Sequence, residues 1–286
     1  MRDNPWTSRR VLCFAHQGGA IEAPSSTLYA ITRAIEHGAT AIELDVHATA
    51  DSRLVVCHDH TLERTTDSSG EIASRTLAEL QELDNAYWFV AGEDVRHDRA
   101  ESEYQLRGLA PSDRRFGIAS LDEVLEATRG VVLNLDIKRS EPEVPAYETL
   151  LADLIREHER GDDVIVASFM DKSTARFKQY APEIATSAGT AAVGEFYRAV
   201  HSGEAPPKDI ECHVALQIPA RYQDILVVDE AFVAAAHSAN LAVHPWTIND
   251  RDEMERLCSI GVDGIISDVP SLLADVLDER GLNWKG

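Results

Sequence analysis

Short apolar runs alternate with amphipathic stretches along most of this 286-residue chain. Such alternation is typical of repeated βα units, in which parallel strands lie side by side and helices pack outside them. The strand candidates are residues 11–16, 41–46, 131–138, 164–169, 184–188, 213–218, 241–248 and 263–268. Helical patterns follow nearly all of them, at residues 26–38, 120–130, 145–158, 172–180, 192–203, 229–240, 250–261 and 271–280. This count predicts an α/β fold, a (β/α)₈ TIM barrel over residues 1–286 as a single domain, with its site at the carboxyl ends of the strands.

One further strand candidate, residues 54–59, does not fit the βα alternation. Only about seven residues separate it from the second strand, fewer than the dozen that a parallel crossover needs, so we expect a hairpin. With the turn centred on Asp51 and Ser52, antiparallel pairing would place His58 opposite Asp45.

A long charged stretch at about residues 60–118 interrupts the βα alternation, and its aromatic residues include Tyr87, Trp88, Phe89 and Tyr104. A segment this long inside a compact domain is usually a functional loop or a small subdomain. We therefore predict an insertion after the second strand that acts as a cap. A solvated surface excursion is the alternative.

The chain is strongly acidic, with 49 Asp and Glu against 27 Lys and Arg and a formal net charge of -22. Nucleic acids and anionic membranes are poor partners for such a surface, because both are bound through clustered basic residues. Adaptation to high salt and an ordinary acidic surface both remain open. We find no apolar run of the length that a signal or a membrane span requires, so a cytoplasmic protein without membrane insertion is expected.

Acidic residues stand at the ends of two predicted strands. Glu43 and Asp45 are two positions apart and therefore share a face of their strand, and Asp136 ends another strand. Taken singly, each acid is expected to be a salt-bridged strand end. Together, three carboxylates favour one hard divalent cation, Mg²⁺, Ca²⁺ or Mn²⁺ rather than Zn²⁺.

Two histidines and a lysine accompany these acids. His16 ends the first strand and His58 ends the hairpin, so both are candidates for proton transfer, although each alone could be a buried structural histidine. Lys138 shares a strand face with Asp136, where it can either neutralise a carboxylate or hold a phosphate oxygen.

Seven short motifs occur in order along the chain. They are HQGG at 16–19, PSST at 24–27, ELD at 43–45, HD at 58–59, NLDIK at 134–138, WTIN at 246–249 and SD at 267–268. Each motif is weak alone, but the ordered set resembles the glycerophosphodiester phosphodiesterases.

This resemblance implies a barrel enzyme that hydrolyses small glycerophosphodiesters to glycerol phosphate and an alcohol, with a divalent metal as cofactor. By the same resemblance, the site residues are assigned to three roles. They are the metal ligands Glu43, Asp45 and Asp136, the catalytic His16 and His58, and the substrate contacts Lys138 on the phosphate and Trp246 in the alcohol pocket.

Three positions depart from the family pattern. The mildest is Asp136, which stands where a glutamate is usual, so the carboxylate is kept and only its reach differs. Gln17 stands where an arginine usually follows the first histidine, so it keeps donors for a phosphate oxygen but carries no charge. Ser25 replaces the glutamate of the second motif. Arg64 and Arg107 are the candidates to supply the missing positive charge.

Three other functions remain open. The barrel could act on a lipid head group, as lysophospholipase D-like or sphingomyelinase D-like enzymes do, and an apolar groove beside the insertion would favour this. It could also be an inactive phosphodiester-binding protein. The sequence HDH at 58–60 suggests, less strongly, a zinc hydrolase. The oligomeric state stays open.

Overall fold

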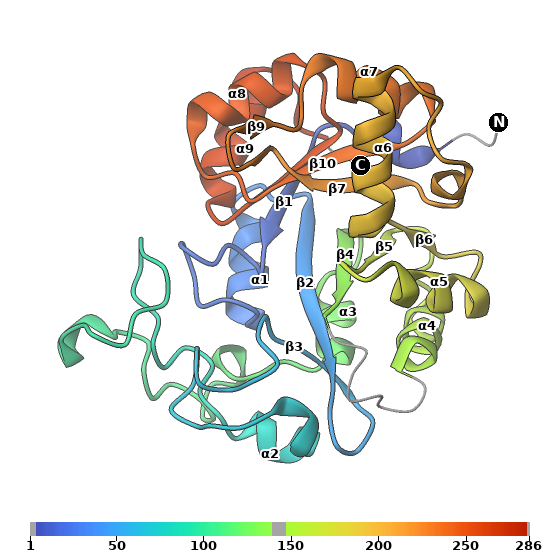
Figure 1. Ribbon diagram of the computed structural model, residues 1–286. Helices are drawn as coiled ribbons and strands as arrows, with labels where there is room; N and C mark the ends of the chain where they lie inside the picture. The colour runs from blue at the N-terminus through green and yellow to red at the C-terminus, as the bar shows by residue number, and fades with distance from the viewer. Residues whose placement is uncertain (1–3, 139–146, 285–286) are drawn as a thin grey trace.

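The computed structural model describes residues 4–138 and 147–284 and has helices arranged around a central set of strands (Figure 1). In this part of the chain the barrel strands are β1 (Leu12–His16), β2 (Ala41–Ala48), β4 (Val132–Ile137), β5 (Val164–Ala167), β6 (Ala185–Thr186), β7 (Ala215–Pro219), β10 (Ala242–Trp246) and β11 (Gly264–Ser267). The outer helices are α1 (Leu28–Glu36), α3 (Leu121–Ala127), α4 (Tyr147–Glu157), α5 (Asp171–Tyr180), α6 (Thr190–Ser202), α7 (Glu230–Ser238), α8 (Arg251–Ser259) and α9 (Pro270–Glu279). Each overlaps a predicted element, although residues 145–146 of the predicted helix 145–158 lie outside the described residues.

The strands follow one another around a ring. Parallel pairing runs in the order β11, β1, β2, β4, β5 and β6, while β7 and β10 form a second parallel pair. A single bridge between Ser187 and Ala215 connects β6 to β7, and the amide of Asp263 donates to the carbonyl of Val243 at 3.0 Å beside β10 and β11. These links join the two sheets, and the predicted TIM barrel is confirmed.

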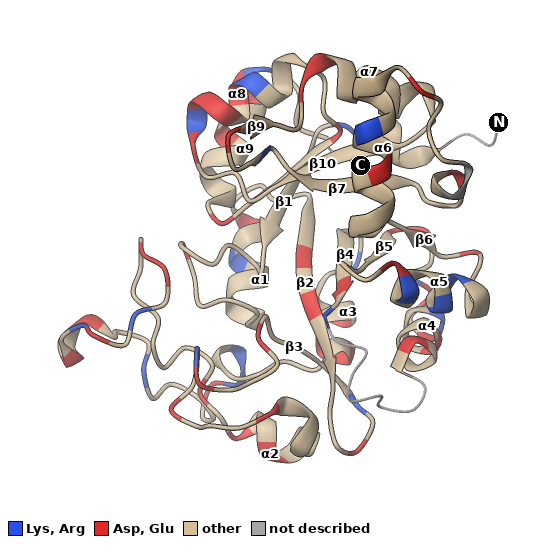
Figure 2. Cartoon of the chain, viewed as in Figure 1, with Lys and Arg blue, Asp and Glu red and all other residues tan. Residues whose placement is uncertain are grey.

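Strand alternation separates two cores. Ile42, Leu44 and Val46 of β2 are fully buried in the layer between strands and helices, as their alternation predicts. Leu12 and Phe14 belong to a second apolar cluster inside the barrel. The intervening positions of β2 turn inward, and its acidic positions appear red in the middle of the strand in Figure 2.

The hairpin formed by β2 and β3 (Leu54–Val56) differs from the prediction by one residue. Val46 pairs with Val56, and the amide of Cys57 donates to the carbonyl of Asp45 at 3.0 Å, so His58 is not opposite Asp45. Thr49 causes the difference: its hydroxyl accepts from the amide of Arg53 at 3.0 Å and closes a longer turn. His58 instead follows the strand in a loop.

The segment between β3 and α3 contains short elements and small hydrophobic clusters of its own. They are the helix α2 (Leu77–Gln81) and the 3-10 turns η2 (Ile72–Ser74), η3 (Glu101–Glu103) and η4 (Arg114–Phe116). In Figure 1 this segment projects away from α7, α8 and α9. Its role as a cap and the single-domain boundaries stay predictions.

The side chain of Arg107 packs among aromatic residues of the inserted segment. Its guanidinium lies over the rings of Tyr87, Trp88 and Tyr104 at 4.2, 4.7 and 3.9 Å, where cation–π attraction stabilises the inserted segment. Arg107 as a source of the missing charge stays a prediction.

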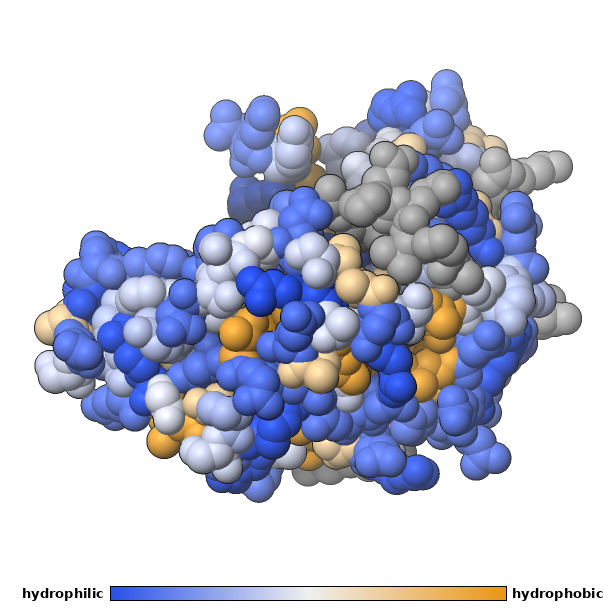
Figure 3. Space-filling view, turned by 90° about the horizontal axis from the view of Figure 1, so that it is seen from below, coloured by the Kyte–Doolittle hydropathy of each residue, from blue (hydrophilic) through white to orange (hydrophobic). Residues whose placement is uncertain are grey.

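Several small elements complete the chain. They are the 3-10 turns η1 (Pro5–Thr7) and η5 (Lys208–Cys212) and the hairpin strands β8 (Arg221–Tyr222) and β9 (Ile225–Leu226). The face in Figure 3 is largely hydrophilic, with hydrophobic residues exposed only in patches. Among the described residues, no helix has the length and apolar character needed to cross a membrane.

Candidate active site

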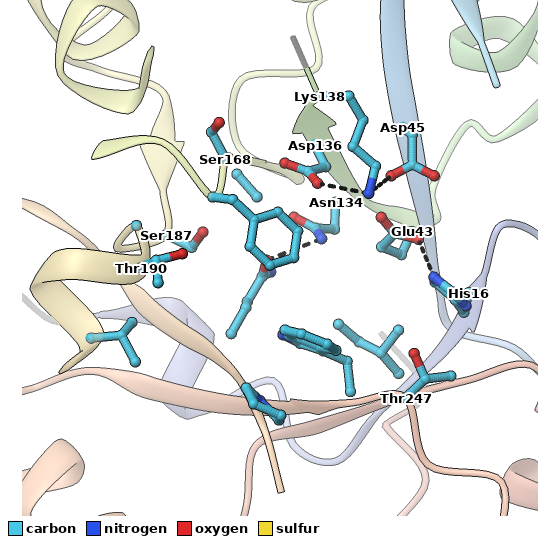
Figure 4. Close-up of a pocket in the computed structure, with 18 of the residues that line it drawn as sticks. His16, Glu43, Asp45, Asn134, Asp136, Lys138, Ser168, Ser187, Thr190 and Thr247 are labelled. Atoms are coloured by element: carbon cyan, nitrogen blue, oxygen red, sulfur yellow. Dashed lines mark hydrogen bonds and ion pairs between the residues drawn. The ribbon is translucent and has the colours of Figure 1, made fainter. Parts of the chain in front are cut away.

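A cavity of about 380 Å³ opens at the carboxyl ends of the barrel strands, where the fold predicts the site (Figure 4). Seven of the eight predicted site residues line it. They are His16, Glu43, Asp45, His58, Asp136, Lys138 and Trp246. Gln17 is not among the residues that line the cavity; it is 4% exposed and its side chain contacts His16, which lines the cavity.

The ammonium group of Lys138 lies between two of the acids. Its Nζ atom is 3.0 Å from Oδ1 of Asp45 and 3.6 Å from Oδ2 of Asp136, while Glu43 points toward His16 (Figure 4). Burial favours a neutral amine, but these two carboxylates raise the pKa of Lys138 above its ordinary value. Lys138 therefore neutralises carboxylates here, one of the two roles predicted for it.

The three acids do not form a ligand set in the structure. Among residues 4–138 and 147–284, no three Asp, Glu, His or Cys side chains are arranged to hold a metal ion. The chemistry of the donors nevertheless suits a hard cation, because Oδ2 of Asp45 and Oδ1 of Asp136 are buried without a hydrogen-bond partner. Burial, together with repulsion from Asp45, raises the pKa of Glu43 to about 8 and that of Asp136 to about 6. A divalent cation would relieve this repulsion.

His16 is held between carboxylates. Its Nδ1 atom is 2.6 Å from Oδ1 of Asp268, and its Nε2 atom is 3.7 Å from Oε2 of Glu43 and 3.2 Å from the amide nitrogen of Gln17. Burial opposes the charged imidazolium, but the bond to Asp268 and the charge of Glu43 raise the pKa of His16 to about 9. The amide nitrogen of Gln17 favours the opposite state, a neutral ring that accepts at Nε2. The charge on His16 depends on the balance of these partners.

His58 lies across from His16, with their ring centroids 6.4 Å apart and nearly perpendicular. Its Nδ1 atom is 2.6 Å from Oδ1 of Asp59, and this bond lowers the pKa of Asp59. The structure therefore brings the two predicted histidines together although the predicted hairpin register is wrong.

The sequence prediction missed a third histidine, His47. Its Nε2 atom is 3.4 Å from the carbonyl oxygen of His58, and its burial lowers its pKa to about 4. His47 lies two positions after Asp45 on β2 and therefore on the same strand face as Glu43 and Asp45. The two-residue period of the strand could have identified it.

The opposite side of the cavity is uncharged. Among the described lining residues, those from β5, β6, β7, β10 and the loops after them carry no charged side chain. Phe169 and Tyr222 are 52% and 61% exposed, and Phe169 packs edge-on against Trp246 with ring centroids 5.6 Å apart. Sequence reasoning assigned no role to either residue: Phe169 ends the predicted strand 164–169, and Tyr222 lies in the two-residue strand β8, which is too short to give a periodic signal. None of the described residues that line this cavity comes from the inserted residues 60–118, so the apolar side of the cavity is not formed by the insertion.

Comparison with known proteins gives the family. The model of the glycerophosphoryl diester phosphodiesterase family matches residues 16–272. The chain belongs to this family. A glycerophosphodiester phosphodiesterase of Caldanaerobacter subterraneus subsp. tengcongensis is 31% identical over 277 residues, covering 95% of this chain and 100% of the relative. The resemblance drawn from the seven motifs is confirmed.

Solved structures agree with the fold. A glycerophosphoryl diester phosphodiesterase domain from Mycobacterium tuberculosis has a TM-score of 0.77 at 18% identity, covering 93% of this chain and 98% of that chain. A phosphodiesterase of Oleispira antarctica, solved with the product sn-glycerol-3-phosphate, has a TM-score of 0.73 at 26% identity, covering 96% of this chain and 99% of that chain. The protein is a hydrolase acting on phosphoric diesters. These matches do not favour the lipid head-group or inactive-barrel alternatives.

Proposed function

We propose that the protein is a metal-dependent phosphodiesterase that hydrolyses glycerophosphodiesters to glycerol phosphate and an alcohol. The supporting observation is the gathering of three carboxylates, one ammonium group and two imidazoles on one side of a single cavity. These groups provide positive charge for a phosphate and a pair of proton-transfer groups close to each other.

In this proposal His16 and His58 are the catalytic residues. One ring takes a proton from the substrate's own neighbouring hydroxyl, which attacks the phosphorus, and the other donates a proton to the leaving alcohol; water then opens the cyclic phosphate with the two roles exchanged. Asp268 and Asp59 hold the two Nδ1 atoms, so each ring presents Nε2 for proton transfer. The assignment of acid and base to the two rings is left open.

Lys138 supplies the fixed positive charge beside the phosphoryl oxygens. Glu43, Asp45 and Asp136 would hold the divalent cation, Mg²⁺ or Ca²⁺ with Mn²⁺ as a third candidate, which when bound stabilises negative charge on those oxygens. Trp246, with Phe169 and Tyr222, would line the side that receives the alcohol.

The first test compares His16→Ala and His58→Ala with a matched control, His37→Ala, whose side chain is exposed on the outer surface. We expect turnover of glycerophosphocholine to be abolished in the two site variants and unchanged in the control. Circular dichroism and the thermal midpoint check that all three fold. Wild-type turnover in either site variant would remove that residue from the mechanism.

The second test removes divalent ions with a chelator and restores them singly. Activity that returns with Mg²⁺, Ca²⁺ or Mn²⁺ supports the proposed ligand set. Full activity in the chelated protein would refute metal dependence, and recovery with Zn²⁺ alone would favour the zinc hydrolase alternative.

A further inference from the structure

One guanidinium group contacts two of the residues that depart from the family pattern. The Nη2 atom of Arg64 is 3.3 Å from Oε1 of Gln17 and 3.4 Å from Oγ of Ser25. Gln17 and Ser25 are 4% and 2% exposed, whereas the side chain of Arg64 is 29% exposed, so these contacts are partly buried. Arg64 enters from the inserted segment, far from both residues in the sequence.

The same guanidinium also reaches the partner of His58. The Nε atom of Arg64 is 3.2 Å from Oδ2 of Asp59, and the other oxygen of Asp59 is 2.6 Å from Nδ1 of His58. On the other side, the amide nitrogen of Gln17 is 3.2 Å from Nε2 of His16. A continuous set of polar contacts thus runs from one histidine to the other through Arg64.

We propose that Arg64 is a positioning residue that orients His16 and His58 through Gln17 and Asp59. Arginine has only donors, so the amide oxygen of Gln17 faces Arg64 and the amide nitrogen faces His16. The planar guanidinium lets one rigid group form an ion pair with Asp59 through Nε and donate to Gln17 through Nη2. A lysine has a single side-chain nitrogen and cannot reproduce both the contact with Asp59 and the contact with Gln17.

A direct contact of Arg64 with the substrate phosphate is the competing role. Neither Arg64 nor Gln17 is among the residues that line the cavity, whereas both histidines are. The guanidinium acts through its neighbours and not on the substrate. The same geometry changes the role of Gln17, which we predicted to contact the phosphate, to that of a link between Arg64 and His16.

This inference rests on the proposed hydrolysis, and it is tested by the steady-state kinetics of Arg64→Met and Arg64→Lys with glycerophosphocholine. Misplacing a reacting group by about 1 Å can lower a rate by about 10²-fold, so we expect kcat of Arg64→Met to fall about 10- to 100-fold with KM nearly unchanged. Arg64→Lys should recover only part of kcat, because it keeps the charge without the fork.

Arg53→Met is the matched control, since Arg53 forms an exposed ion pair with Asp122 at 3.1 Å, away from the histidines. Thermal midpoints of all variants separate lost positioning from lost folding. The fold loss of kcat in the double variant Gln17→Met with Arg64→Met should be much smaller than the product of the two single losses. The reason is that Arg64 acts on His16 through Gln17, so the two changes remove the same contact chain.

Three results would overturn the inference: kcat of Arg64→Met within about twofold of wild type, a rise in KM at unchanged kcat, or a loss that matches the unfolded fraction. The second would place the guanidinium on the substrate. A wild-type protein without turnover would instead overturn the proposed function.

Discussion

Replacing His244 with leucine should make the protein less sensitive to acid. His244 of β10 is fully buried inside the barrel beside Phe14, and neither of its ring nitrogens has a hydrogen-bond partner. Burial alone lowers its pKa from 6.5 to about 3. In the folded barrel the His244 ring therefore stays neutral at pH values at which the same ring in the unfolded chain has already bound a proton.

The sign and size of the effect follow from this pKa. Because the unfolded chain binds the proton first, stability from His244 is present above pH 6.5 and is lost as the pH falls toward 3. At about 1.36 kcal/mol for each unit of pH, the free energy of unfolding should fall by about 1.4 kcal/mol between pH 7.5 and 5.5 through this residue. In His244→Leu this contribution to the pH dependence of the free energy of unfolding should be absent. The contributions of all other titrating groups should remain.

Urea unfolding, followed by tryptophan fluorescence at pH 7.5 and 5.5, gives the free energy of unfolding of wild type and variant at each pH. Both values lie above the sequence pI of about 4.8, which limits precipitation. His37→Leu serves as the control, because an exposed histidine should change the pH dependence little. Equal pH dependence in wild type and His244→Leu would refute the reasoning, since it would show that the buried ring binds a proton as readily as in the unfolded chain.

Further predictions concern the cavity. Lys138→Met should lower kcat by about 10²-fold or more, because it removes the fixed cation beside Asp45, and retained kcat would contradict this role. Asp268→Asn should lower the pKa of His16, so the limb of the kcat/KM profile that titrates His16 should move to lower pH; an unmoved limb would show that Asp268 does not control it. Trp246→Ala should raise KM for glycerophosphocholine more than it lowers kcat, and an unchanged KM would place the alcohol elsewhere.

Much of the fold could be predicted because its signals are local. The alternation of apolar and polar residues along β2 assigns Ile42 and Leu44 to the helix layer and Glu43 and Asp45 to the interior, whatever the rest of the chain does. The hairpin register could not be predicted in this way, because it depends on the hydrogen bonds that Thr49 makes within the turn.

By itself, the sequence determined the βα repeat and the presence of acids, histidines and a lysine at strand ends, since strand and helix periods place these residues without long-range information. Only the tertiary structure placed the ammonium of Lys138 between two carboxylates and the guanidinium of Arg64 between Gln17 and Asp59. The path of the inserted loop brings Arg64 to Gln17, and such a path depends on packing between distant segments rather than on any local pattern.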